Sequence, residues 1–314
     1  MLVKDVVAEI ADLNKTLVNS HLADLSQMNP EDIKLYAQVW KTIETKRRRE
    51  VITRLIELAT DSVELNFDSI FKSCLHDPDA DVRSEAINGL WESEDASLIS
   101  PIIEILNADP SEKVQVAATM ALGRFALLAE LGSISPRYGN LVSQILLAVN
   151  SDKSKAIEVR RRALEAVATI STQQVKTAIK DAYDSGDERM AISAVYAMGR
   201  NCDPAWLPII IRELNNREAE MRYEAVCACG EIGNEDTIQY LLLIGNDTDI
   251  DIRLAVIQAM GKIGGNEAKK YLQRNANDPS EAVREAIEQA LSEISIQDDM
   301  TILQMEQQRK KYEN

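Results

Sequence analysis

Few residues of this chain have the types and spacings that catalysis or metal binding would need. The two histidines, His21 and His76, lie far apart, and His76 directly precedes an aspartate of a predicted turn, which favours a structural role. Cys227 and Cys229 are two residues apart on a predicted helix, so their thiols point roughly 200° away from each other and cannot bind one metal ion. The sequence contains neither a glycine-rich phosphate loop nor a nucleophile elbow. We therefore expect no catalytic residue, no metal site and no cofactor.

The charge of the chain disfavours two further classes of partner. There are 51 acidic and 35 basic residues, a net charge of −16, which repels phosphate backbones and anionic lipids. Two basic runs, residues 46–49 and 160–162, could each hold an anion locally, but neighbouring glutamates predict that they are solvated or ion-paired. Nothing resembles a signal peptide, no apolar stretch reaches the length of a membrane span, and the four cysteines lack the spacing of a disulfide framework. These features predict a cytoplasmic protein.

One short helical pattern recurs eight times along the chain. Its first apolar residue, here called the register residue, is followed by small or apolar residues four and seven positions later, and four copies close as Ala-Leu-Gly or a near variant. Five of the seven spacings are 31 residues, and the register residues are Val51, Val82, Val114, Val159, Met190, Met221, Ile252 and Val283. Each copy predicts a hairpin of helix A and helix B, with a single apolar stripe on helix B. Repeats of this length are typical of a solenoid.

The turn that precedes helix B recurs as well. Five residues before the register residue stand Asp77, Asp109, Asp247 and Asp278, with Asn216 and Ser185 in two other copies. We expect these side chains to bond backbone N–H groups at the start of helix B. The segment 77–83, from Asp77-Pro78 to Val82-Arg83, resembles a HEAT repeat, specifically the phycobilisome-lyase-like HEAT type. Residues 221–233 and 252–264 resemble it too, and the resemblance extends well over 62–294 and more weakly over 30–60.

The resemblance implies a ladder in which the turn aspartate pairs with the arginine of helix B in a neighbouring repeat. That arginine is present as Arg83, Arg160, Arg222, Arg253 and Arg284. Gln115 and Ala191 take its place in two copies, where the ladder should be interrupted. Iron-binding HEAT-like hydroxylases carry several His-Glu pairs on successive helices, which are missing here, and HEAT-like DNA glycosylases use a basic groove, which the negative charge disfavours. The family name also suggests an accessory role in chromophore (bilin) attachment.

The period defines the expected domains. From Val114 to Val159 the interval is 45 residues, 14 more than the usual period, and the excess contains 131–140, a loop by composition. Such an insertion is either functional or only a longer connection. We predict an amino-terminal helical cap at 1–29, a solenoid at 30–296 with the insertion around 125–155, and a polar helix or tail at 297–314. The fold class is all-α, a right-handed superhelix of about eight HEAT-type hairpins.

A set of apolar residues departs from the expected pattern of helix B. Positions +2 and +6 after the register residue should face away from helix A, toward the concave side, where polar residues are expected. The residues found there, with Trp91 at +9, are Val116, Ile192, Tyr223 and Leu254 at +2 and Met120 and Tyr196 at +6. Exposed apolar residues in line along a solenoid indicate a groove for a peptide, rimmed by Glu165, Glu224 and Glu231. Alternatively, the +2 residues pack against the neighbouring helix B.

These patterns favour a non-catalytic scaffold that binds a partner protein or peptide along its concave face. Bilin attachment and, more weakly, nucleic-acid processing are the alternatives, and an exposed apolar patch could also serve self-association. The identity of the partner does not follow from the sequence.

Overall fold

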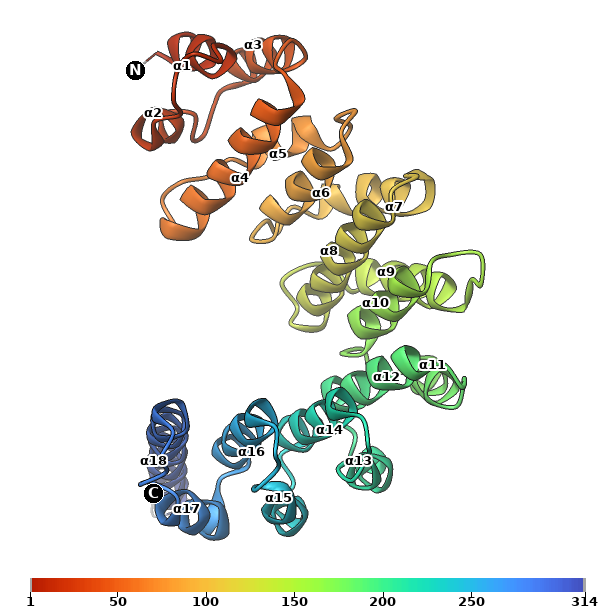
Figure 1. Ribbon diagram of the computed structural model, residues 1–314, viewed down its shortest axis with the longest axis vertical. Coiled ribbons are helices and arrows are strands. Elements are labelled where there is room, and N and C mark those ends of the chain that lie inside the picture. Colours follow the sequence, from red (N-terminus) through yellow and green to blue (C-terminus); the bar gives the residue numbers. More distant parts are fainter. Residues whose placement is uncertain (1, 313–314) are drawn as a thin grey trace. The chain divides into compact units, whose positions relative to one another are not determined.

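The computed structural model describes the backbone of residues 2–312 and the side chains of residues 2–297. Every regular element in this part is helical: eighteen α-helices and three short 3₁₀ helices (Figure 1). The prediction of an all-α solenoid is confirmed. No helix among the described residues is long and apolar enough to span a membrane.

Eight hairpins follow two amino-terminal helices, α1 (Val3–Ala11) and α2 (Asn19–Ala23). In chain order the hairpins are α3 (Pro30–Trp40) with α4 (Thr45–Asp61), α5 (Asp68–Cys74) with α6 (Ala80–Gly89), α7 (Ile99–Ala108) with α8 (Glu112–Glu130), α9 (Pro136–Ser151) with α10 (Ile157–Val167), α11 (Gln173–Tyr183) with α12 (Glu188–Asn201), α13 (Leu207–Glu213) with α14 (Ala219–Ile232), α15 (Ile238–Ile244) with α16 (Ile250–Ile263), and α17 (Gly265–Arg274) with α18 (Glu281–Tyr312). The 3₁₀ helices Ala96–Leu98, Pro204–Trp206 and Glu235–Thr237 lead directly into α7, α13 and α15. The predicted tail at 297–314 falls largely outside the described side chains.

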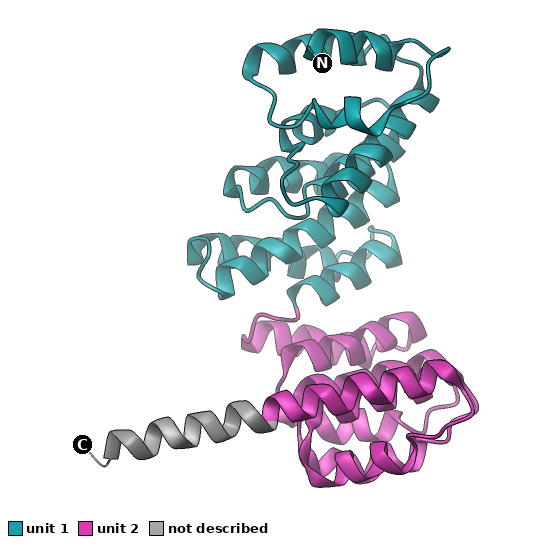
Figure 2. Cartoon of the chain, turned by 90° about the vertical axis from the view of Figure 1, so that its left-hand side faces the viewer, with its two compact units in different colours: residues 1–167 teal, residues 168–314 magenta. Residues whose placement is uncertain are grey.

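The chain divides into two compact units, residues 1–167 and 168–314 (Figure 2). In the first unit the B helices α4, α6, α8 and α10 contact one another in sequence, and in the second α12, α14, α16 and α18 do the same. From α5 onward, each A helix packs against the B helix of its own hairpin. The predicted apolar stripe is buried: in α16, Ile252, Val256 and Met260 are at most 1% exposed.

Glycine at position +9 sets how closely neighbouring B helices approach. A Cβ added at Gly199 would lie 2.7 Å from the Cα of Ala228 on the next B helix, and one at Gly230 would lie 2.9 Å from the Cα of Ala259. Because any larger residue would push the helices apart, the Ala-Leu-Gly ending is a packing motif. The same contact joins Gly123 to Ala166 and Gly261 to Ala290.

The insertion lengthens two helices more than it lengthens a loop. The B helix α8 has 19 residues, against 14 in α12, α14 and α16. The A helix α9 has 16, against 7 to 11 in α7, α11, α13 and α15. The loop predicted at 131–140 is confined to 131–135, because Pro136 occupies the first turn of α9. Proline suits that place since it has no N–H to leave unpaired. The composition of the segment therefore suggested a longer loop than the chain forms.

Side chains in the turns organise the hairpins as expected. Asp77, Asp109 and Asp247 each accept the backbone N–H of the residue two positions later, at 2.9 Å. Asp278, Asn216 and Ser185 do the same in their own turns. These bonds satisfy N–H groups at the start of six of the eight B helices, α6, α8, α12, α14, α16 and α18.

The arginine ladder is present in part. Arg83 binds both carboxylate oxygens of Asp109 in the next turn, at 2.7 and 2.9 Å, and Arg222 binds both oxygens of Asp247, at 2.8 and 3.1 Å. At the interrupted position Gln115 donates to the carbonyl of Asp109 and accepts from the Lys155 ammonium.

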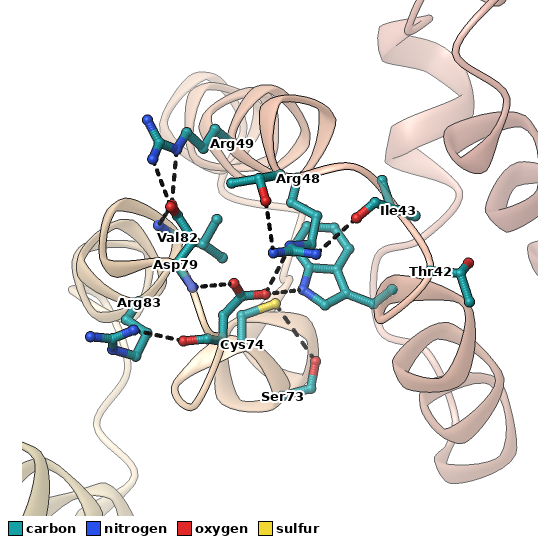
Figure 3. A network of polar contacts seen from close by, with 12 residues as sticks. Thr42, Ile43, Arg48, Arg49, Ser73, Cys74, Asp79, Val82 and Arg83 are labelled. Carbon is teal, nitrogen blue, oxygen red and sulfur yellow. Dashed lines mark hydrogen bonds and ion pairs between the residues drawn. The ribbon is translucent and has the colours of Figure 1, made fainter.

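The first repeat begins one helical turn earlier than the sequence pattern indicated. In the other B helices the register residue is the third residue of the helix and the ladder arginine is the fourth; in α4 those places belong to Arg47 and Arg48, not to Val51 and Ile52. Arg48 Nε lies 3.1 Å from Asp77 Oδ2 of the next turn, and its Nη1 donates to the carbonyl of Ile43 at 2.8 Å (Figure 3).

The basic run 46–49 forms the expected ion pair, because Arg47 Nη1 donates to Glu50 Oε2 at 3.0 Å, but two of its arginines are buried, which the sequence did not suggest. Arg47 and Arg48 are 6% and 7% exposed. Arg47 donates to the backbone carbonyls of Ile10 and Lys15 and so ties the end of α1 to the first hairpin. Lys46 and Arg49 are exposed. Arg49 pairs with Asp79 (Figure 3) and with Asp81. The run 160–162 does match expectation, since Arg162 pairs with Glu158 and Glu165.

Candidate partner-binding surfaces

The B helices of the second unit carry three of the predicted partner-binding residues at their surface. Tyr196 on α12 is 38% exposed and Tyr223 on α14 is 36% exposed. Leu254 on α16 is half-buried. The three side chains come from consecutive, contacting helices, so apolar surface recurs from one repeat to the next.

Ile192 was predicted to be an exposed partner-binding residue. That prediction is wrong, because Ile192 is only 5% exposed. It lies seven residues before Gly199, and at about 100° per residue the two point to within about 20° of each other. Since Gly199 is the contact with α14, a residue at +2 faces the neighbouring B helix. The alternative considered for the +2 set therefore holds for Ile192, whereas Val116, Tyr223 and Leu254 at the same position keep part of their surface exposed.

A groove opens beside Tyr223, between α14 and α16. Its volume is about 430 Å³. Tyr223, Leu254 and Ala255 give it an apolar lining. Glu220, Asp249 and Asp251 also line it and make its rim acidic. Two residues predicted from the sequence are thus brought to one site.

The acidic rim is formed by other residues than the sequence suggested. Glu231 is paired with Lys262 at 2.6 Å and with Arg200 at 3.4 Å, and Glu165 is paired with Arg162 at 2.8 Å. These carboxylates are therefore largely neutralised. The carboxylates of the observed rim were missed because Asp249 is the N-cap of α16 and Glu220 and Asp251 lie in first helical turns, where acidic residues are expected for capping alone.

The first unit carries a second apolar surface, on α8 and in the turn that follows α6. Met120 and Trp91 are both 46% exposed, and Val116 is half-buried. Trp91 is not on the face of helix B as predicted, because α6 ends at Gly89 and Trp91 lies in the following turn. The guanidinium of Arg124 lies 5.6 Å from its ring centroid, a cation–π contact.

Side chains that could do redox or metal chemistry are dispersed. His21 Nδ1 lies 2.9 Å from Glu9 Oε1, while His76 is exposed in a different hairpin. Burial raises the pKa of Cys229 to about 12, which marks this thiol as a small core residue. No group of three or more histidine, cysteine or carboxylate side chains that could hold a metal ion occurs within the described part of the chain.

Comparison with known families agrees with this architecture. HEAT repeats match residues 68–148 and 207–292, which together make up more than half of the chain. The chain belongs to the HEAT repeat family. This match is coarser than the phycobilisome-lyase-like type that the sequence resembles, and no curated protein sequence matches the chain.

Solved structures share the fold at low sequence identity. Yeast importin-beta is similar with a TM-score of 0.58 and 12% identity, over 93% of this chain and 46% of that chain. Human deoxyhypusine hydroxylase in complex with glycerol has a TM-score of 0.35 and 17% identity, over 93% of this chain and 96% of that chain. A designed armadillo repeat protein in complex with the peptide (KR)4 has a TM-score of 0.42 and 19% identity, over 62% and 99%. Importin-beta supports the solenoid fold, and the other two likenesses are too weak to add to it. None supports a role in bilin attachment.

Proposed function

We propose that the chain is a non-catalytic scaffold that binds a partner protein through the B helices of its second unit. The observation that carries the proposal is the exposure of Tyr196 and Tyr223 on consecutive B helices, with Leu254 and a groove beside the second tyrosine. Tyrosine is enriched at protein interfaces because it offers a large apolar area together with a polar tip.

The spacing of these helices suits an extended segment. Packed helices lie about 8–10 Å apart, which corresponds to roughly three residues of extended chain. In a partner segment that crosses α12, α14 and α16, about every third side chain would therefore contact the next helix. Importin-beta has the same fold, and HEAT solenoids in general present such surfaces to other proteins.

The test is capture of binding proteins by the tagged full-length chain from its host. Tyr196→Glu combined with Tyr223→Glu should abolish capture of the specific partner without unfolding the chain, because both residues are exposed. Tyr240→Glu is the matched control, since Tyr240 is also 38% exposed but lies on the A helix α15. Capture that survives the double substitution, or is lost equally with Tyr240→Glu, would place the site elsewhere.

A further inference from the structure

The groove between α14 and α16 has a rim of negative charge that the described residues leave unbalanced. Glu220 and Asp251 are exposed in the first turns of their helices, and Asp249 caps α16 by accepting the N–H of Asp251 at 2.9 Å. None of the three forms an ion pair with another residue in the described part of the chain. Asp247, only two residues from Asp249, is by contrast neutralised by Arg222. Asp249 also acts on Arg222, whose pKa is raised chiefly by Asp247 and further by Asp249, so the uncompensated charge of the rim is that of Glu220 and Asp251.

The lining of the groove adds an aromatic ring to these carboxylates. Tyr223 is 36% exposed there and stands next to Leu254. The pKa of Tyr223 is raised, first by the Cys227 thiol and by burial, and further by the carboxylates of Glu224 and Asp251. A ring beside the carboxylates of Glu220 and Asp251 suits a guanidinium group, which stacks on aromatic faces and donates to carboxylates.

We infer that this groove recognises an arginine within an extended, basic segment of the partner protein. The guanidinium would lie against the ring of Tyr223 within reach of Glu220 and Asp251, and an adjacent apolar side chain would contact Leu254. A second copy of this chain fits less well, because its own net charge of −16 opposes association with an acidic rim. The inference rests on the proposed function and specifies the chemistry of the partner.

A selection from a random dodecapeptide library tests the inference without a known partner. The library is selected on the immobilised full-length chain and, in parallel, on Tyr223→Ala. Peptides that depend on Tyr223 should carry arginine next to an apolar residue, and their affinity should fall about fivefold or more in Tyr223→Ala. Glu220→Gln with Asp251→Asn should weaken the best peptide by about fivefold or more, and raising the salt from about 50 to 500 mM should weaken it further.

Matched variants separate the groove from general charge and exposure. Tyr240→Ala removes an equally exposed tyrosine from α15 and should leave binding unchanged. Glu104→Gln with Asp181→Asn removes two exposed carboxylates from the A helices α7 and α11 and should also leave it unchanged. Equal loss with this pair would show that net charge alone drives binding and would overturn the inference.

The remaining outcomes distinguish the inference from the proposed function. Peptides that depend on Tyr223 but are neutral or acidic would overturn the arginine site and leave the scaffold proposal standing. If no selected peptide depends on Tyr223, the groove is not a peptide site, and the capture experiment alone then judges the scaffold. A wild-type dimer in sedimentation equilibrium that Tyr223→Ala converts to a monomer would identify a second copy as the occupant and would also overturn the inference.

Discussion

Arg48 and Arg49 are neighbours in sequence but should contribute very differently to stability. The side chain of Arg48 is 8% exposed and faces Asp77, whose side chain is 1% exposed, whereas the side chain of Arg49 is 50% exposed. Asp77 also accepts the indole N–H of Trp40 at 2.7 Å. Removing one partner of a buried ion pair leaves an uncompensated charge, which typically costs about 3–5 kcal/mol. Arg48→Met should therefore lower the free energy of unfolding by about that amount.

Arg49→Met is the control for this prediction. Its ion pairs with Asp79 and Asp81 are solvated on the arginine side, and such pairs contribute little. The urea midpoint of this variant should stay close to that of the parent chain. The double variant Arg48→Met with Asp77→Asn should recover part of the loss, because it removes both buried charges.

Trp40 provides a local reporter for the measurement. The chain has three tryptophans, so Trp91→Phe with Trp206→Phe leaves Trp40 alone at the ion pair. Fluorescence of Trp40 during urea unfolding reports the first hairpins directly, which matters because repeat arrays can lose two-state cooperativity. If Arg48→Met and Arg49→Met shift the midpoint equally, or the double variant is no more stable than Arg48→Met, the buried pair is refuted.

Three further predictions concern helix packing, a helix end and pH. Gly199→Ala should destabilise the second unit by about 1–3 kcal/mol in urea unfolding, because the added methyl would meet Ala228, although alanine favours helices; a more stable variant would contradict this. Cys202→Gly should stabilise by about 0.5–1 kcal/mol, since Cys202 ends α12 with φ 54°, a conformation that glycine adopts without strain; an unchanged melting temperature would be the contrary result. The pKa of Asp95 is lowered to about 2, chiefly by the bond from Lys72, so its contribution to stability is complete above about pH 4 and is lost as the pH falls toward 2. Lys72→Met should make unfolding less sensitive to pH in that range, and an identical pH profile would exclude the pair.

The sequence predicted the fold because the features that define it recur at a fixed distance. A buried stripe such as Ile252, Val256 and Met260 can be recognised from one repeat alone, and its recurrence predicts stacked hairpins. The same stripe misplaced the first repeat. Apolar residues recur every turn of a helix, so Val51 and Leu55 fitted the pattern one turn too late. Only the polar pair of Arg48 and Asp77, which joins two repeats, identifies the correct turn.

The charged rim shows a second reason why the site was only partly predictable. Glu231 was placed on the rim as a free carboxylate from the sequence, because no basic partner for it lies on its own helix. Its partners, Arg200 and Lys262, each lie 31 residues away, one repeat on either side. Ion pairs between neighbouring B helices therefore follow the repeat period, so the neutralised carboxylates could have been found by comparing residues at that distance. The carboxylates left over, such as Glu220 and Asp251, would then have emerged as the acidic rim.

Tyr223 exposes apolar surface although it occupies an interface position of the repeat. This position faces the next B helix, whose distance is set by the glycine at +9 and the alanine opposite it. Ile192 fits within that contact and is buried, whereas the ring of Tyr223 is too long and projects from it. Gly230 keeps α14 in close contact with α16. The two helices therefore do not move apart to make room for the ring between them. The repeat packing thus stays intact while one oversized side chain at an interface position creates apolar surface, which is how a regular solenoid can acquire a specific binding site without losing its core.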